Sequence, residues 1–136
     1  MEAETYAVQV SFGDCDPAGI VFYPNVLRWC DASFHAFLRH HGGHAEICSA
    51  FQAVGIGVAE SGARFLSPLR DGDGLVITTR ISDWGRKTLT LLHVGTVDAR
   101  TAFEVTEVRC LFKAGESGIV AAEVKALREM LQMGGV

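Results

Sequence analysis

A single long helical pattern, with strand patterns on either side of it, is the feature that most constrains the fold of this chain. Apolar and small residues recur with helical spacing from Val26 to His41, just after Pro24 and just before Gly42-Gly43. Proline suits the first turn of a helix, where its missing N–H is not needed, and glycine suits the end. We therefore expect one helix of about five turns, whose wide aromatic face must be buried against another element.

Alternating apolar and polar residues predict strands before and after this helix. One strand is expected at residues 5–12, and four more are expected at 58–66, 75–82, 88–97 and 102–112. Shorter helices are expected at 45–53 and 126–133. Because the later strands have short connections, the sheet should be antiparallel and the long helix should lie against it. No linker or repeat interrupts the pattern, so we predict a single α+β domain over residues 1-136.

Charge and composition exclude several classes of function. The 16 acidic and 12 basic residues give a net charge of −4, which offers no overall positive field to nucleic acid. No apolar run approaches the roughly 18–20 residues of a membrane span, and the acidic start Met1-Glu2-Ala3-Glu4 is unlike a secretory signal. The four cysteines form no C-x-x-C pair, which suits a reducing compartment. We expect a cytoplasmic protein without nucleic-acid or membrane partners.

No motif predicts a metal site or a bound cofactor. His40 and His44 are four residues apart, but Gly42-Gly43 breaks the helix that would align them as ligands. The run from Asp71 to Gly74 is similar to the start of a calcium loop, yet its third ligand position is Leu75. A tight turn explains that run better, so we expect no metal and no cofactor.

The best candidate for a functional site is the segment FGDCDPAGIVFYPN, from Phe12 to Asn25. It places Asp14 and Asp16 in a loop between the first strand and the long helix. Loop aspartates commonly form turns or caps, and that interpretation stays open. Alternatively, Asp16 acts as a base or nucleophile, while N–H groups at the helix start near Tyr23 stabilise an oxyanion at the positive end of the helix dipole.

This segment resembles the signature of the 4-hydroxybenzoyl-CoA thioesterase family within the hotdog-fold superfamily. The resemblance rests on Phe12 to Gly19, Phe22 to Asn25, Arg28-Trp29 and Asp31-Ala32, and continues more weakly through Trp84 to Thr88. It implies a hotdog fold, in which an antiparallel five-stranded sheet wraps around one long helix. It also implies a homodimer or homotetramer with active sites at the subunit interface.

The resemblance further implies an acyl-CoA thioesterase that acts on an aromatic or short acyl group. Asp16 matches the catalytic carboxylate, which would serve as nucleophile or general base. Tyr23 matches the residue whose backbone N–H faces the thioester carbonyl, and Asp31 matches a helix position near the acyl group. Arg86 and Lys87 match part of a basic cluster that contacts the nucleotide phosphates.

Two other functions stay open. Hotdog proteins include acyl-chain hydratases and dehydratases, but these use a histidine and a carboxylate in a sequence setting that His35 to His44 does not match. A non-catalytic acyl-CoA-binding protein would keep the fold without turnover, and the presence of Asp16 argues against it. A thioester hydrolase is therefore the favoured prediction.

Overall fold

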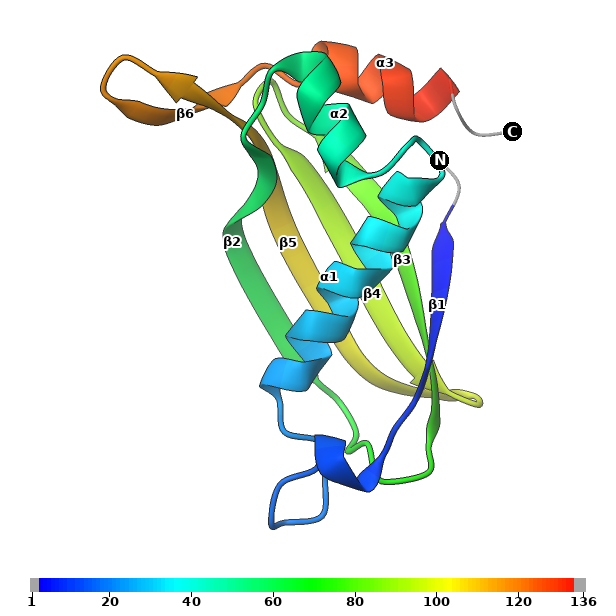
Figure 1. The fold of residues 1–136 in the computed structure, drawn as a ribbon. Helices are drawn as coiled ribbons and strands as arrows, with labels where there is room; N and C mark the ends of the chain where they lie inside the picture. The colour runs from blue at the N-terminus through cyan, green and yellow to red at the C-terminus, as the bar shows by residue number, and fades with distance from the viewer. Residues whose placement is uncertain (1–2, 134–136) are drawn as a thin grey trace.

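The computed structural model describes residues 3–133 and has one curved antiparallel sheet with a long helix across its inner face (Figure 1). The strand order is β1-β3-β4-β5-β2, and β6 pairs with the end of β5. No helix among these residues is long and apolar enough to span a membrane. The strands are β1 (Glu4–Gln9), β2 (Gly55–Phe65), β3 (Gly74–Trp84), β4 (Leu89–Val97), β5 (Arg100–Gly115) and β6 (Gly118–Ala122), and the helices are α1 (Pro24–Arg39), α2 (His44–Phe51) and α3 (Lys125–Met133).

The predicted antiparallel sheet and long helix are confirmed, with one addition. Residues 116–117 form the turn of a hairpin that joins β5 to a sixth strand, β6, which the sequence pattern did not predict. Strand β6 was missed because it is only five residues long and its apolar residues, including Ile119 and Val120, are exposed. The hairpin projects beyond the body of the sheet in Figure 1.

Residues close in the sequence explain where helix α1 begins and ends. Pro24 occupies its first turn, and the chain leaves the helix through Gly42 and Gly43, whose φ angles are 99° and 94°. The N–H of Gly43 donates to the carbonyl oxygen of Leu38 (2.9 Å), which satisfies an end carbonyl of the helix. The regular helix therefore stops at Arg39, two residues before the predicted end.

A buried polar belt separates two apolar clusters beneath α1. One cluster packs on the first half of the helix, around Val26 and Trp29, and the other packs on the second half, around Phe34 and Leu38. The belt crosses β3, β4 and β5 between them. Its members are at most 4% exposed, and they are Ser33, Thr79, His93, Glu107 and Arg109.

Each member of the belt meets a neighbour at hydrogen-bond distance. The hydroxyls of Ser33 and Thr79 are 2.7 Å apart, and Thr79 Oγ1 lies 2.6 Å from His93 Nδ1. His93 Nε2 lies 2.8 Å from Glu107 Oε1, which also accepts from Arg109 Nη2 at 3.0 Å. A neutral His93 with its proton on Nε2 satisfies the whole row, because Ser33 then donates to Thr79 and Thr79 donates to Nδ1.

The belt makes the stability of the fold depend on the charge of Glu107. Burial by itself raises the pKa of Glu107, but the hydrogen bond from His93 and the charge of Arg109 outweigh this effect and hold the pKa below its usual 4.5. A carboxylate with a lowered pKa stabilises the folded state above its unfolded pKa, and this contribution is lost as pH falls through the folded value.

Glu107→Gln should lower the free energy of unfolding at pH 7 by about 3 kcal/mol, because Arg109 loses its buried partner charge. The variant should also lose less stability than the wild type as the pH falls below about 4.5, since the titrating group is gone. Urea unfolding at pH 7, 5 and 4, at one protein concentration, measures both effects. Glu104→Gln is the control, because its exposed pair with Arg64 should contribute less than about 1 kcal/mol. Equal profiles for Glu107→Gln and the wild type would contradict this assignment.

Candidate active site

The loop between β1 and α1 is held by backbone hydrogen bonds and by Asp14. The Asp14 carboxylate accepts a hydrogen bond from the N–H of Ser11 (2.8 Å). The backbone carbonyl oxygen of Asp14 accepts from the N–H of Phe22 and from the side chain of Asn25, both at 2.9 Å. Asp14 therefore has the structural role that loop aspartates commonly have. It ties the start of the loop to the start of α1.

Asp16 lies at the tip of the same loop and is partly buried. Its N–H donates to Ile20 (2.9 Å), its carbonyl oxygen accepts from Gly19 (2.9 Å), and its Oδ1 accepts from the N–H of Ala18 (2.9 Å). Gly19 has a φ of 80°, which favours glycine at this turn. Among residues 3–133 the second carboxylate oxygen, Oδ2, meets no hydrogen-bond donor, so it is available for chemistry.

Tyr23 directly precedes the first residue of α1, and its backbone N–H differs from those of its neighbours in the hydrogen bonds it makes. The N–H groups of Phe22 and Asn25 on either side are bound to Asp14 and Phe22, respectively. The Tyr23 N–H has no acceptor among the described residues. Because it stands at the positive end of the helix dipole, it can stabilise a developing negative charge.

Asp16 and Tyr23 line one pocket of about 650 Å³. Its inner wall is buried and apolar, and its rim carries the exposed side chains of Tyr23, Phe65 and Leu66. The rings of Tyr23 and Phe65 meet edge to face with centroids 6.3 Å apart. The lining residues are Asp16, Ile20, Val21, Tyr23, Val26, Phe65, Leu66, Ser67, Pro68, Leu69, Ala102 and Phe103.

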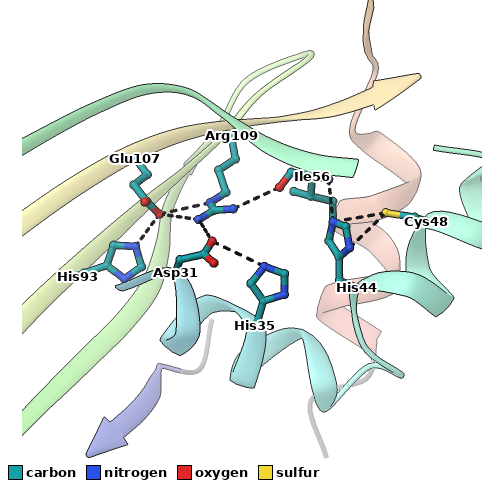
Figure 2. Close-up of polar contacts among 8 residues, drawn as sticks. All are labelled: Asp31, His35, His44, Cys48, Ile56, His93, Glu107 and Arg109. Carbon is teal, nitrogen blue, oxygen red and sulfur yellow. Dashed lines mark hydrogen bonds and ion pairs between the residues drawn. The ribbon is translucent and has the colours of Figure 1, made fainter. Parts of the chain in front are cut away.

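Asp31, the third predicted site residue, lies outside this pocket. It is eight residues beyond Tyr23, or roughly 12 Å along α1. Figure 2 shows its carboxylate between Arg109 and His35: Oδ1 accepts from Arg109 Nη2 at 2.8 Å and lies 3.6 Å from His35 Nε2. Burial lowers the pKa of His35, and the charge of Asp31 offsets this effect only in part. Arg109 is therefore the side chain beside Asp31 that stays positively charged. Half of the Asp31 side chain stays exposed.

Arg86 and Lys87 lie at the opposite end of the molecule from Asp16. They follow β3, whose first residue Gly74 pairs with Gln9 near the Asp16 loop, and β3 spans eleven residues or roughly 33 Å. Arg86 donates to Glu123 through Nε at 3.0 Å. The structure therefore brings Asp16 and Tyr23 together within one chain, but not Arg86 and Lys87.

The histidines near the end of α1 have separate partners. His40 Nε2 lies 2.9 Å from Glu4, and His44 Nε2 accepts from the N–H of Ile56 at 3.1 Å. Figure 2 shows Cys48 beside the His44 ring, and its Sγ lies 3.6 Å from the same nitrogen. Among the described residues, no three His, Cys, Asp or Glu side chains converge as metal ligands.

The sequence pattern did not predict a role for His93, Glu107 and Arg109, which connect Asp31 to the core. A charged residue at an inward-facing strand position would have been the signal. Neither face of residues 102–112 is uniformly apolar, however, because one carries Glu107 and Arg109 and the other carries Glu104 and Thr106. Only the pairing of β5 with β4 shows that the side chains of Glu107 and Arg109 lie on the inner face of the sheet.

Comparisons with known proteins identify relatives that cover much of the chain. Residues 18–98 match the model of the Thioesterase superfamily. The 4-hydroxybenzoyl-CoA thioesterase of Pseudomonas sp. (strain CBS-3) is 34% identical over 91 residues, 65% of this chain and 64% of that protein. A 1,4-dihydroxy-2-naphthoyl-CoA hydrolase of Thermosynechococcus vestitus (strain NIES-2133 / IAM M-273 / BP-1) is 31% identical over 108 residues, 78% of this chain and 74% of the relative.

The structural comparison covers more of the chain. The solved Pseudomonas thioesterase superposes with a TM-score of 0.83 and 29% identity, covering 96% of this chain and 99% of that one. A structure of a 4-hydroxybenzoyl CoA thioesterase in which an aspartate is replaced by asparagine, complexed with 4-hydroxybenzoyl CoA, also gives a TM-score of 0.83, with 29% identity, and covers 95% of this chain and 97% of that one. These superpositions confirm the predicted hotdog fold.

Proposed function

This chain belongs to the Thioesterase superfamily, and we propose that it hydrolyses the thioester bond of an aromatic acyl-CoA to the free acid and CoA. The observation that carries this proposal is that the Asp16 carboxylate and the backbone N–H of Tyr23, which has no acceptor among the described residues, belong to residues lining the same apolar pocket. We assign the activity to residues 1–136 as a single domain. A cytoplasmic location is consistent with the four unlinked cysteines.

Thioester hydrolysis needs an attacking group and a place for the negative charge that forms on the carbonyl oxygen. In one route Asp16 removes a proton from water, and the water oxygen attacks the carbonyl carbon. In the other route Asp16 attacks directly, and water then hydrolyses the mixed anhydride. In both routes the Tyr23 N–H stabilises the oxyanion, the C–S bond breaks, and CoA leaves as a thiolate that takes up a proton.

The aromatic acyl group is supported by the pocket and by the relatives. The buried wall of the pocket is apolar, and the relatives are named for hydroxybenzoyl and dihydroxynaphthoyl substrates. Within one chain Asp31 lies outside this pocket, so we assign the Asp31 of a second copy to the polar end of the acyl group; its carboxylate is half exposed on α1 and Arg109 keeps it fixed. A ring hydroxyl donating to Asp31 would favour hydroxylated acyl groups.

We propose that the working enzyme is at least a homodimer, with a homotetramer as the larger alternative. Strand β2 pairs with β5 on one side, and no described strand pairs with its other edge. Residues 58–65 of this strand are exposed on both faces. An open edge invites pairing with a second chain. A second copy would also supply Arg86 and Lys87, which are too far from Asp16 to serve the site of their own chain.

Asp16→Asn should lower kcat by at least ~10²-fold, because the variant can neither attack nor accept the proton. Asp14→Asn is the matched control in the same loop. Asparagine keeps an oxygen acceptor for Ser11, so this variant should stay within about threefold of the wild type. Release of free thiol from 4-hydroxybenzoyl-, benzoyl- and fatty acyl-CoA measures the rates. Near-normal turnover by a folded Asp16→Asn would rule out the catalytic assignment, and hydration products or binding without thiol release would favour the other hotdog functions.

Arg86→Ala should raise KM for the CoA ester by roughly fivefold, about the effect of one exposed charge pair, and should spare the matching pantetheine ester. The Arg86 guanidinium is exposed, and phosphate would compete with Glu123 for it. Raised salt should act in the same direction. Arg80→Ala, an exposed arginine on the outer face of β3, is the control. Equal changes in KM for both esters would show that Arg86 does not contact phosphate.

Sedimentation equilibrium at micromolar concentration should give at least a dimer. Val58→Glu should shift the protein toward monomer and reduce turnover, because it places a charge on the open edge strand, where Val58 is 46% exposed. Val76→Glu, a similar change on β3, should leave the dimer intact. A fully active monomeric wild type would refute a site shared between subunits.

A further inference from the structure

A glycine on β4 shapes the inner wall of the pocket. Phe103 lines the pocket and pairs directly with Gly95 across β4 and β5. A Cβ atom built on Gly95 would lie 2.8 Å from Cδ2 of Phe103, and nearer still to its Cε2 and Cζ. Side-chain carbons do not approach ring atoms so closely. The ring of Phe103 therefore fills the space that a side chain at position 95 would need.

Phe103 is fully buried and lies beneath the pocket that it helps to line. Its second neighbour in the sheet is Phe65 on β2, whose side chain is 53% exposed at the rim. The pocket lies on this β2 side, bounded by Phe65, Val26 and Ala102. Among the described residues, no residue of β4 lines it. The Phe103 ring, packed over Gly95, is therefore part of the buried floor of the pocket.

A larger residue at position 95 would move the ring into the pocket. Side chains occupy a few staggered rotamers, so a displaced Phe103 ring must take another well. Behind it lies the close-packed core around Val105 and Ile77, both fully buried. The pocket, which Phe103 already lines, is the empty space next to the ring, so we expect the ring to move toward it.

We propose that Gly95 and Phe103 set the size of the acyl group that the enzyme accepts. Gly95 is a positioning residue in this scheme, because it acts through Phe103 without touching the substrate. The inference rests on the proposed function, since the acyl group enters this pocket only if its thioester carbon lies at Asp16 and Tyr23. With glycine at position 95, a pocket of about 650 Å³ accepts a fused two-ring aromatic acyl group as well as a single ring.

Gly95→Ala should lower kcat/KM for 2-naphthoyl-CoA by at least ~10-fold and leave kcat/KM for propionyl-CoA within about threefold of the wild type. The double variant Gly95→Ala/Phe103→Leu should recover naphthoyl hydrolysis to within about threefold, because leucine lacks the ring atoms that meet the new methyl group. Gly57→Ala is the matched control. Its Cβ would lie 2.9 Å from the ring of Phe112, outside the pocket, so it adds a milder contact with a ring elsewhere in the sheet and should not change the naphthoyl-to-propionyl ratio.

The opposite change keeps the inference testable if Gly95→Ala does not fold. Phe103→Leu alone should raise the ratio of kcat/KM for naphthoyl-CoA over benzoyl-CoA, because the smaller side chain deepens the pocket. An unchanged ratio in Phe103→Leu, or an equal loss for both substrates in Gly95→Ala, would overturn the inference.

A binding measurement separates this inference from the proposed reaction. The non-hydrolysable thioether S-(2-naphthylmethyl)-CoA should bind Gly95→Ala at least ~10-fold more weakly than the wild type, while S-propyl-CoA should bind both equally. Titration calorimetry on the folded variants measures both dissociation constants. If the wild type hydrolyses no thioester yet shows this difference, the reaction is wrong and the pocket inference stands. If hydrolysis is present and neither measurement responds to Gly95→Ala, or if the naphthyl thioether does not bind the wild type, the inference is overturned.

Discussion

The buried guanidinium of Arg109 is the constraint on which the arrangement of the helix and sheet depends. It is 2% exposed, and a buried charge is strongly destabilising unless its partners are in place. Those partners come from different parts of the chain: Glu107 beside it, the carbonyl oxygen of Ile56 on β2 at 3.2 Å, and Asp31 on α1 at 2.8 Å. The ring of Phe34 covers it at 4.5 Å. Helix α1 and strand β2 must therefore lie where they can reach one group.

This constraint reaches the catalytic loop through the helix. Two side chains of α1 bind the belt residues on the sheet: Asp31 accepts from Arg109, and Ser33 lies at hydrogen-bond distance from Thr79. These two contacts fix the position of the helix along the sheet. With α1 fixed, the N–H of Tyr23 has a fixed place at its start. Asn25, in the first turn, then holds the carbonyl of Asp14 and so positions the loop that carries Asp16. Such rigidity matters because a small misplacement of reacting groups lowers the rate steeply.

Local chemistry explains which features the sequence could predict. The helix from Pro24 was predictable because proline, the apolar spacing and Gly42-Gly43 act within a few residues of each other. The loop was predictable because glycine, proline and aspartate are concentrated in it. Glu107 and Arg109 were not predictable, because their burial is decided by pairing with a strand that is distant in the sequence. The dependence of Phe103 on Gly95 has the same origin, since only the register between β4 and β5 places them side by side.

The choice of acyl group and the affinity for the nucleotide depend on different parts of the proposed enzyme. The wall of the pocket is built within one chain, by Val26, Ala102 and Phe103, so the choice of acyl group is set inside the subunit. The candidate phosphate contacts Arg86 and Lys87 lie beyond the far end of β3, a strand roughly 33 Å long that begins near the Asp16 loop, so affinity for the nucleotide depends on how copies assemble. A net charge of −4 is compatible with this division, because a few cations supplied by a neighbouring copy suffice for the polyphosphate. Substitutions in the pocket wall at Val26, Ala102 or Phe103 should therefore alter specificity without altering assembly, and substitutions on β2 outside the pocket, such as at Val58, should alter assembly without altering the choice of acyl group.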